Sequence, residues 1–282
     1  MSFSVEIIKD SSYDGIRGTT FQLKYPRFIH SEFMTHRVFS RNASSSRAIP
    51  VEKMIEFIEN DTAKPIHWGK NKPGMQADEE CSAYIEIDGR SYHKFDAWNI
   101  ARDDAIKNAK AFHRAGYHKQ IVNRILEPYA HINVIVTATS FENFFLLRSH
   151  KDAQPEIKVL SDMMKDLYET NKPDEIGPGV WHLPYVSDVE KEKYDIDDQL
   201  KLTTARCARV SYLTHDGKAP SYEADIKIYD QLITSKPIHA SPAEHQFQFL
   251  NSIMRYSEND DKGGNLGKGL VQYRKLIEGW WA

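Results

Sequence analysis

The sequence predicts a mixed α+β fold. Strand-like and helix-like segments alternate along its 282 residues without the regular rhythm of βαβ units. Two of the strand-like segments alternate apolar with polar residues, which is typical of strands with one solvated face and favours a partly antiparallel sheet. With 40% hydrophobic residues, the chain has enough apolar material for one large domain or two smaller ones.

Three segments carry the pattern of strands. Residues 20–25 and 245–250 place apolar side chains at every second position, so each is expected to bury one face. Residues 131–139 form a nearly continuous β-branched run, which predicts a strand that is covered on both faces.

Three helices follow from apolar residues at helical spacing. The first spans 98–112 and is expected to end at Gly116, and the second contains the stripe 157–167. The third is expected to begin with Ser221 as its N-cap and to stop before Pro237. These stripes predict core packing and carry no functional signal.

Composition argues against several classes of protein. The 37 basic and 40 acidic residues nearly balance, so we expect neither a general polyanion binder nor a specific nucleic-acid partner. The N-terminal residues lack the pattern of a secretion signal, and no apolar run is long enough to span a bilayer. We therefore expect a cytoplasmic protein without a membrane partner. Cys81 and Cys207 imply no disulfide framework, so the glycosylation pattern at Asn42 is expected to be unused.

Two polar stretches are expected to connect folded parts. Residues 186–202 are dense in charge and predict an exposed linker, for which a helical form stays open. Residues 257–269 are polar and glycine-rich and predict a mobile loop. This stretch is not a phosphate-binding P-loop, because Lys262 and Gly269 stand where that motif needs glycine and Ser or Thr.

Metal and nucleophile chemistry find little support in the sequence. HASPAEH (239–245) lacks the one-turn spacing of two zinc-binding histidines, and Pro242 interrupts the helix that such a site needs. No G-x-S-x-G motif is present. Cys207 lies between Arg206 and Arg209, and the sequence leaves open whether it is an activated thiolate or a small core residue.

Four short polar motifs remain, namely THRVFSRNASSSRA (35–48), LLRSHKDAQPEI (146–157), TARCARVSY (204–212) and HASPAEH (239–245). Each offers Arg, Ser or His to a bound anion or to a planar ligand rich in heteroatoms. For the first motif, a solvated loop and a nonspecific nucleic-acid patch are competing interpretations. Taken singly, each arginine is equally compatible with a surface salt bridge.

The first motif resembles the signature of the flavin-dependent thymidylate synthases, with matches at His36, Arg37, Ser40, Asn42, Ser45 and Arg47. The second resembles another block of that family, with matches at Asn143, Arg148, Ala153, Gln154, Glu156 and Ile157. TARCARVSY and HASPAEH resemble blocks that precede the signature in the family, whereas here they follow it. This order is similar to that of a circularly permuted, phage-type member, a single catalytic domain (1–282) in which 186–202 join the permuted halves.

The resemblance implies an α+β subunit with helices around a mainly antiparallel sheet, assembled as a homotetramer with active sites where subunits meet. It implies reductive methylation of dUMP to dTMP with FAD, NADPH and 5,10-methylenetetrahydrofolate, and without an enzyme nucleophile. A phage-encoded protein of this kind would act in the host cytoplasm. Two alternatives stay open: 5-hydroxymethylation of dUMP or dCMP, and a nucleotide- or RNA-binding homologue without catalysis.

The resemblance also assigns roles to residues. Substrate positions are Glu32, Ser44, Ser45, Ser46, Arg47, Arg124 and Arg148. Ser45, Arg47 and the amides of Ser44 and Ser46 would hold the phosphate, and Arg148 would be the catalytic residue that stabilises negative charge on the pyrimidine. Cofactor positions are Thr35, His36, Arg37, Val38, Asn143, Ser211, His239, Ser241 and Glu244. No metal ligand is implied.

The chain departs from the family pattern near these positions. Thr35 replaces the first arginine of the signature, and Glu32 replaces a glutamine that commonly contacts the nucleotide, which bears on pyrimidine preference. At the flavin site, three residues replace the usual Asn, Arg and His: Thr137, Thr139 and Asp152. Alanine stands where Glu and Tyr are common, at Ala43 and Ala48. The loss of three basic groups predicts a changed affinity for FAD or a changed binding mode.

Overall fold

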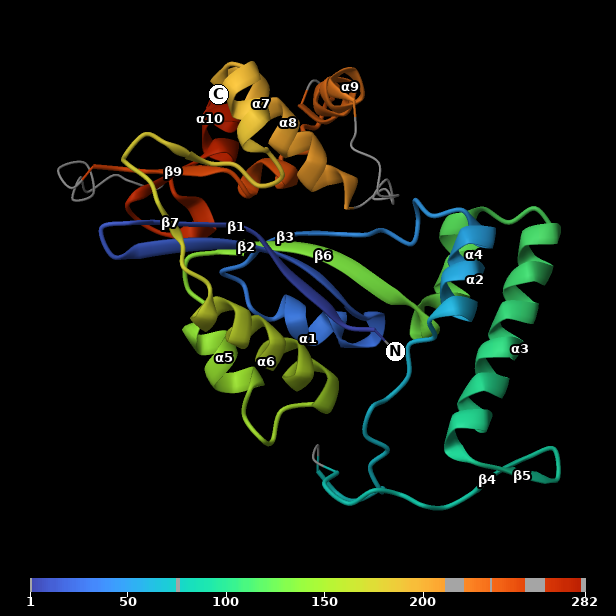
Figure 1. The fold of residues 1–282 in the computed structure, drawn as a ribbon. Coiled ribbons are helices and arrows are strands. Elements are labelled where there is room, and N and C mark those ends of the chain that lie inside the picture. The colour runs from blue at the N-terminus through green and yellow to red at the C-terminus, as the bar shows by residue number, and fades with distance from the viewer. Residues whose placement is uncertain (1, 75–76, 211–220, 234, 252–261, 280–282) are drawn as a thin grey trace.

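A computed structural model describes residues 2–74, 77–210, 221–233, 235–251 and 262–279 (Figure 1). The predicted α+β class is confirmed, because helices lie on both sides of a central sheet whose strands pair mostly antiparallel. No helix in these described ranges is both long and apolar enough to cross a membrane.

Five strands form the central sheet in the order β3-β6-β2-β1-β7, and the β1–β7 pair alone among them is parallel. The strands are β1 (Ser4–Tyr13), β2 (Ile16–Pro26), β3 (Ser40–Ala43), β6 (His131–Ala138) and β7 (Asp174–Glu175). β1 and β2 form a hairpin with the two-residue turn Asp14-Gly15. Both turn residues have positive φ, as a type I′ turn requires.

Burial confirms the predicted strand patterns. β2 buries Phe21, Leu23 and Tyr25 on one face, whereas β6 buries residues 134–136 in succession. β6 therefore has both faces covered, and it lies between β2 and β3.

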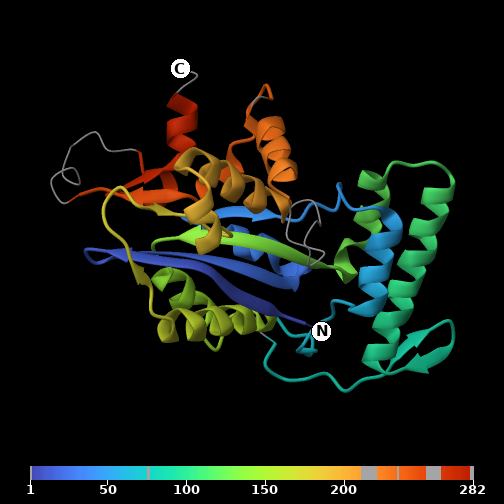
Figure 2. The ribbon, with the colours of Figure 1, turned by 45° about the horizontal axis from the view of Figure 1, so that its top comes forward.

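Helices α1, α5 and α6 cover one face of the central sheet (Figures 1 and 2). Their bounds are His30–Met34, Glu142–Arg148 and Pro155–Thr170, and a 3-10 helix, η1 (Arg27–Ile29), precedes α1. The main core lies here and joins Phe21 of β2 to Phe33, Phe144 and Leu160. The helix predicted from the stripe 157–167 is α6.

A group of three helices packs beside the sheet (Figure 1). It consists of α2 (Val51–Asn60), α3 (Lys94–Arg114) and α4 (Lys119–Leu126), with the hairpin β4–β5 (Ile85–Ile87 and Arg90–Tyr92) before α3 and η2 (Glu127–Tyr129) after α4. The predicted helix 98–112 lies within α3. Gly116 follows with φ of 87°, as expected for a glycine that ends a helix.

The C-terminal part covers the opposite face of the central sheet (Figure 2). It contains α7 (Asp188–Lys193), α8 (Ile196–Arg209), α9 (Tyr222–Ile233), η3 (Ser241–Glu244), η5 (Gly264–Leu266) and α10 (Tyr273–Gly279). A small sheet, in the order β10-β9-β8, is formed by Leu270–Gln272, Phe247–Phe249 and Trp181–His182. The predicted strand 245–250 is β9, and Ser221 caps α9 by accepting from the amide of Ala224 at 3.2 Å.

The structure adds detail to both predicted connectors. Segment 186–202 takes the helical form that the sequence left open, and much of it is exposed. α7 begins with a capping box between Ser187 and Glu190, and Glu190 also pairs with the buried Arg206. Other charges of the segment pair within their own helices, as Lys191 does with Asp188 and Lys201 with Asp198. Of the predicted mobile loop 257–269, residues 257–261 lie outside the described residues, and the rest forms a packed turn with Leu266 buried.

Candidate functional site

The end of α5 and the turn after α1 bring three predicted site residues together. Arg148 donates from Nε to His36 Nε2 at 3.0 Å and from Nη2 to Thr35 Oγ1 at 3.1 Å. Because Nε2 of His36 accepts a hydrogen bond, its ring is neutral and carries its proton on Nδ1. Burial, and then the charges of Arg148 and Arg41, lowers the pKa of His36 to about 4. A neutral His36 thus orients the guanidinium of Arg148.

The surroundings of His36 fix its position. Its ring meets Phe144 edge to face with centroids 4.9 Å apart and stacks on Phe39 at 5.7 Å. Arg41 of β3 reaches back to donate to the carbonyl oxygens of His36 at 3.0 Å and Met34 at 3.1 Å. The sequence did not predict Arg41 as a site residue, although it lies inside the signature motif. It braces the turn that presents His36 to Arg148.

Exposed apolar side chains adjoin this cluster along the chain. Met34 and Val38 flank the turn, Leu146 and Leu147 precede Arg148, and these four are between 43% and 73% exposed. Single exposed apolar residues are ordinary, but several beside a cluster of polar donors mark a surface suited to a ligand or to another chain.

The serine-rich loop 44–47 is held by the helix group. Asn123, fully buried on α4, donates from Nδ2 to Ser46 O at 2.7 Å and to Ile49 O at 2.9 Å. The hydroxyl of Ser46 donates to Glu127 Oε1 at 2.5 Å. These bonds fix the backbone of the loop from inside, so that its outer side chains hold defined positions.

The predicted phosphate ligands of this loop differ in accessibility. The amide of Ser44 donates to Asn133 O at 2.8 Å, so it is already used within the sheet in this structure. Ser45 is half-buried and Arg47 is exposed. Arg124 is also exposed and directly follows the helix residue that holds the loop. The donors on the surface of this region are thus Ser45, Arg47 and Arg124.

Segment 239–245 lies against β3, far from it in the sequence. In the amide orientation that satisfies both side-chain atoms, Asn42 of β3 donates from Nδ2 to Ser241 O at 3.1 Å and to Arg41 O at 3.0 Å. The side chain of Ser241 is exposed, and Glu244 pairs with Arg274 of α10. The HASPAEH motif and the signature motif are therefore neighbours in space.

The other predicted cofactor and substrate residues are placed as follows. Arg37, Val38, Asn143 and His239 are exposed, and Glu32 is half-buried. Ser211 lies outside the described residues. Within one chain the predicted substrate residues do not all meet, because Arg148 ends α5 below the sheet, whereas Arg124 lies on α4 in the helix group beside it (Figures 1 and 2).

Two of the departures from the family pattern turn inward. Thr137 is fully buried, with its hydroxyl 2.7 Å from that of Thr20 and 2.8 Å from His245 Nδ1. Thr139 donates to Leu266 O at 2.6 Å. Both hydroxyls are engaged within the chain. Sequence reasoning missed this buried polar arrangement, for which the only signal in β6 was Thr137 within its apolar C-terminal half.

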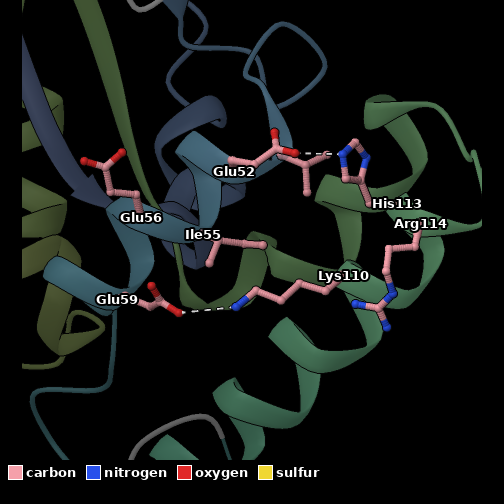
Figure 3. A pocket seen from close by; sticks show the side chains of 8 residues that line it. Glu52, Ile55, Glu56, Glu59, Lys110, His113 and Arg114 are labelled. Atoms are coloured by element: carbon pink, nitrogen blue, oxygen red, sulfur yellow. Dashed lines mark ion pairs between the residues drawn. The ribbon is translucent and has the colours of Figure 1, made fainter.

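A surface cavity of about 310 Å³ lies between α2 and α3 (Figure 3). Ion pairs cross it from Glu52 to His113 at 2.7 Å and from Glu59 to Lys110 at 3.8 Å. Ile55 contributes to its lining. None of the predicted site residues lines it.

Metal and thiol chemistry receive no support from the structure. Across the described part of the chain, no three His, Cys, Asp or Glu side chains gather as metal ligands. Burial raises the pKa of the Cys207 thiol, which is fully enclosed, so the small core residue is the correct interpretation of the two.

The α+β scaffold presents guanidinium and hydroxyl donors beside apolar surface, which are the groups that anionic small molecules use. Residues 17–174, more than half of the chain, match the Thy1 family, described as thymidylate synthase complementing protein. The chain belongs to this family. The match includes the signature motif and LLRSHKDAQPEI, while TARCARVSY and HASPAEH lie outside it.

The individual relatives share little sequence identity with this chain. The chain is 26% identical over 164 residues to flavin-dependent thymidylate synthases of Tropheryma whipplei strains TW08/27 and Twist. The alignment covers 55% of this chain and spans only 65% and 64% of those proteins. Among solved structures, a UMP/dUMP methylase PolB from Streptomyces cacaoi bound with 5-Br dUMP is similar, with TM-score 0.45 and 16% identity over 59% of this chain and 90% of that one.

Proposed function

We propose that this protein reductively methylates dUMP to dTMP, with FAD as its bound cofactor, NADPH as reductant and 5,10-methylenetetrahydrofolate as carbon donor. The observation that carries the proposal is the guanidinium of Arg148, oriented by neutral His36 within the signature motif of the family. When bound, the flavin would supply the electrons, and the chain would supply binding, orientation and charge.

Arg148 is suited to the pyrimidine. A guanidinium has five N–H donors, and among the described residues Arg148 uses only its Nε and one Nη2 donor within the chain. The remaining donors are available to carbonyl oxygens of a uracil ring, where they would stabilise negative charge that develops as C5 becomes nucleophilic. Thr35 and His36 hold the guanidinium plane, so little reorientation is needed on binding.

The surface donors at Ser45, Arg47 and Arg124 are suited to the nucleotide phosphate. A braced loop with one hydroxyl and nearby guanidinium groups matches a dianion that accepts several charge-assisted hydrogen bonds. Because this group and Arg148 lie in different parts of one chain, we propose that a second copy completes each site in a homotetramer. The exposed apolar residues beside Arg148 support such an interface.

The flavin positions suit an anionic cofactor with a ring system. Arg37, Ser241 and Asn143 are exposed donors, and Val38 offers exposed apolar surface. The contact between Ser241 and the signature strand also supports the proposal of a circular permutation, since the HASPAEH block lies beside the motif that it precedes in the family.

The visible spectrum of the purified protein, followed by anaerobic NADPH with and without dUMP, tests the proposal. We expect a flavin band that bleaches faster with dUMP, and dTMP as the product by mass spectrometry. A hydroxymethyl product would replace methylation by 5-hydroxymethylation of dUMP or dCMP. A colourless protein that takes up no FAD would contradict both enzymatic reactions and leave a non-catalytic binder.

A pair of variants isolates the role of Arg148. Arg148→Gln is expected to lower turnover by roughly 100-fold or more, because a preorganised charge donor is lost. Arg114→Gln, at the exposed end of α3, is the matched control and is expected to keep wild-type turnover. Equal activities of the two variants would contradict the assignment.

A further inference from the structure

A continuous row of buried polar side chains crosses the central sheet. Nδ1 of His182, on β8, is 2.9 Å from Ser11 Oγ, and Nε2 of the same ring is 2.8 Å from Thr20 Oγ1. Thr20 Oγ1 is 2.7 Å from Thr137 Oγ1. The first two strands, β6 and the small sheet are thereby linked through side chains that are fully buried.

The row continues to the signature strand. Thr137 Oγ1 is 2.8 Å from His245 Nδ1, and His245 Nε2 is 3.3 Å from the side-chain amide of Asn42. Asn42 in turn donates to the carbonyl oxygens of Arg41 and Ser241. The row therefore ends where the HASPAEH segment touches β3.

The amide orientation of Asn42 fixes the direction of every bond in the row. The two hydrogens of the Asn42 amide go to Arg41 O and Ser241 O, and its nitrogen also faces Nε2 of His245. Because a proton on Nε2 would point at this NH2 group, the ring proton is on Nδ1 and is donated to Thr137. A hydroxyl donates only one hydrogen, so Thr137 then donates to Thr20 and Thr20 to Nε2 of His182. The Nδ1 proton of His182 is left for Ser11. Within this sequence Thr137, Thr20 and His182 each accept one hydrogen bond and donate one.

The direction requires both histidines to be neutral. Burial lowers the pKa of His245 to about 3. Burial, and then the charges of Lys9 and His245, lowers the pKa of His182 well below its usual value. A protonated ring has two donors and no acceptor, which would break the sequence of bonds at that point.

We propose that Thr137 and His245 are positioning residues, which set the amide of Asn42 and thereby hold the Ser241 segment in register with the signature strand. The functional consequence rests on the proposed function, because Ser241 is a predicted flavin contact. The resemblance places a direct flavin contact at position 137. Here Thr137 would instead support the flavin site indirectly, because it helps to hold the backbone at Ser241. Such a row is more specific than apolar packing, because each of its bonds has one direction.

Two substitutions at one position test the proposal. Thr137→Val is nearly isosteric but removes the hydroxyl that joins Thr20 to His245, whereas Thr137→Ser keeps it. Thr204→Val is the matched control, since Thr204 is equally buried and its hydroxyl has no hydrogen-bond partner among the described residues. The readouts are the ¹⁵N shifts of selectively labelled histidine, the side-chain amide signals of Asn42 and the dissociation constant for FAD.

In the wild-type protein we expect the Nδ1–H tautomer at His245, without protonation at pH 5. Thr137→Val should shift the tautomer and the Asn42 signals and weaken FAD binding by about tenfold, the effect of one hydrogen bond. Thr137→Ser and Thr204→Val should leave the His245 tautomer, the Asn42 signals and FAD binding as in the wild type. An Nε2–H tautomer in the wild type, or unchanged Asn42 signals in Thr137→Val, would overturn the inference. Failure of the wild type to bind FAD would count against the proposed function alone, because the tautomer is read without ligand.

Discussion

Acid should destabilise this protein through His245, and the size of the effect follows from its burial. The ring is fully buried, and burial lowers its pKa to about 3 in the folded state, whereas an unfolded chain gives a histidine a pKa of about 6.5. Because the folded state resists protonation, the unfolded state binds more protons below pH 6.5. The stability that His245 contributes is present above that pH and is lost as the pH falls from about 6.5 toward 3.

The magnitude is set by the gap between the two pKa values. Once the unfolded state is protonated and the folded state is not, stability falls by about 1.4 kcal/mol per pH unit for one group. Between pH 7 and pH 5, this slope applies only over the roughly 1.5 pH units below about 6.5. His245 should therefore account for a loss of about 2 kcal/mol in the free energy of unfolding. Burial also lowers the pKa of His36 and His30 to about 4, so the wild-type protein should lose more than this in total.

Urea unfolding at pH 7, 6 and 5 measures the effect. His245→Gln should be less stable at pH 7, because the ring packs and bonds in the core, but it should lose about 2 kcal/mol less than the wild type between pH 7 and pH 5. His239→Gln, at an exposed position six residues earlier, serves as the matched control and should keep the wild-type slope. Identical pH slopes for wild type and His245→Gln would refute the reasoning.

Three further predictions concern buried groups. Asn123→Ala should lower the free energy of unfolding by roughly 2–3 kcal/mol and weaken dUMP binding, because the carbonyls of Ser46 and Ile49 lose their donor; a stability equal to wild type in urea would contradict this. Asp225→Asn should cost about 3–5 kcal/mol, since it leaves two buried arginines without their shared carboxylate, and a loss below 1 kcal/mol would count against it. Cys207 should resist iodoacetamide in the folded protein while the partly exposed Cys81 reacts, and mass spectrometry that finds equal labelling would refute this.

Local periodicity was enough to predict three strands and three helices of the fold. The alternation in 20–25 and the β-branched run 131–139 each correspond to a strand with the expected burial, because side-chain direction in a strand depends only on position along it. Gly116 and Ser221 mark helix ends because their conformational and hydrogen-bonding preferences act within a few residues. The signature motif likewise indicated the family without any tertiary information.

Charge patterns predicted less of the structure, because the sequence does not show which residue a charged side chain will pair with. Composition left open whether the segment 186–202 is helical, and it gave no sign that Glu190 meets Arg206. The approach of Arg148 to His36 joins residues 112 positions apart, and no local pattern encodes that distance.

The sequence by itself determined the class of fold, three strands and three helices, and the family, since these depend on local propensity and on motifs that are contiguous along the chain. Tertiary structure alone decided which polar residues reach the surface and which turn inward. Thr137 illustrates the difference: the sequence marks it as a lost cofactor contact, whereas the fold encloses it between Thr20 and His245. The physical reason is that a buried hydroxyl must find a hydrogen-bond partner, and its partners come from strands and turns that only folding brings together.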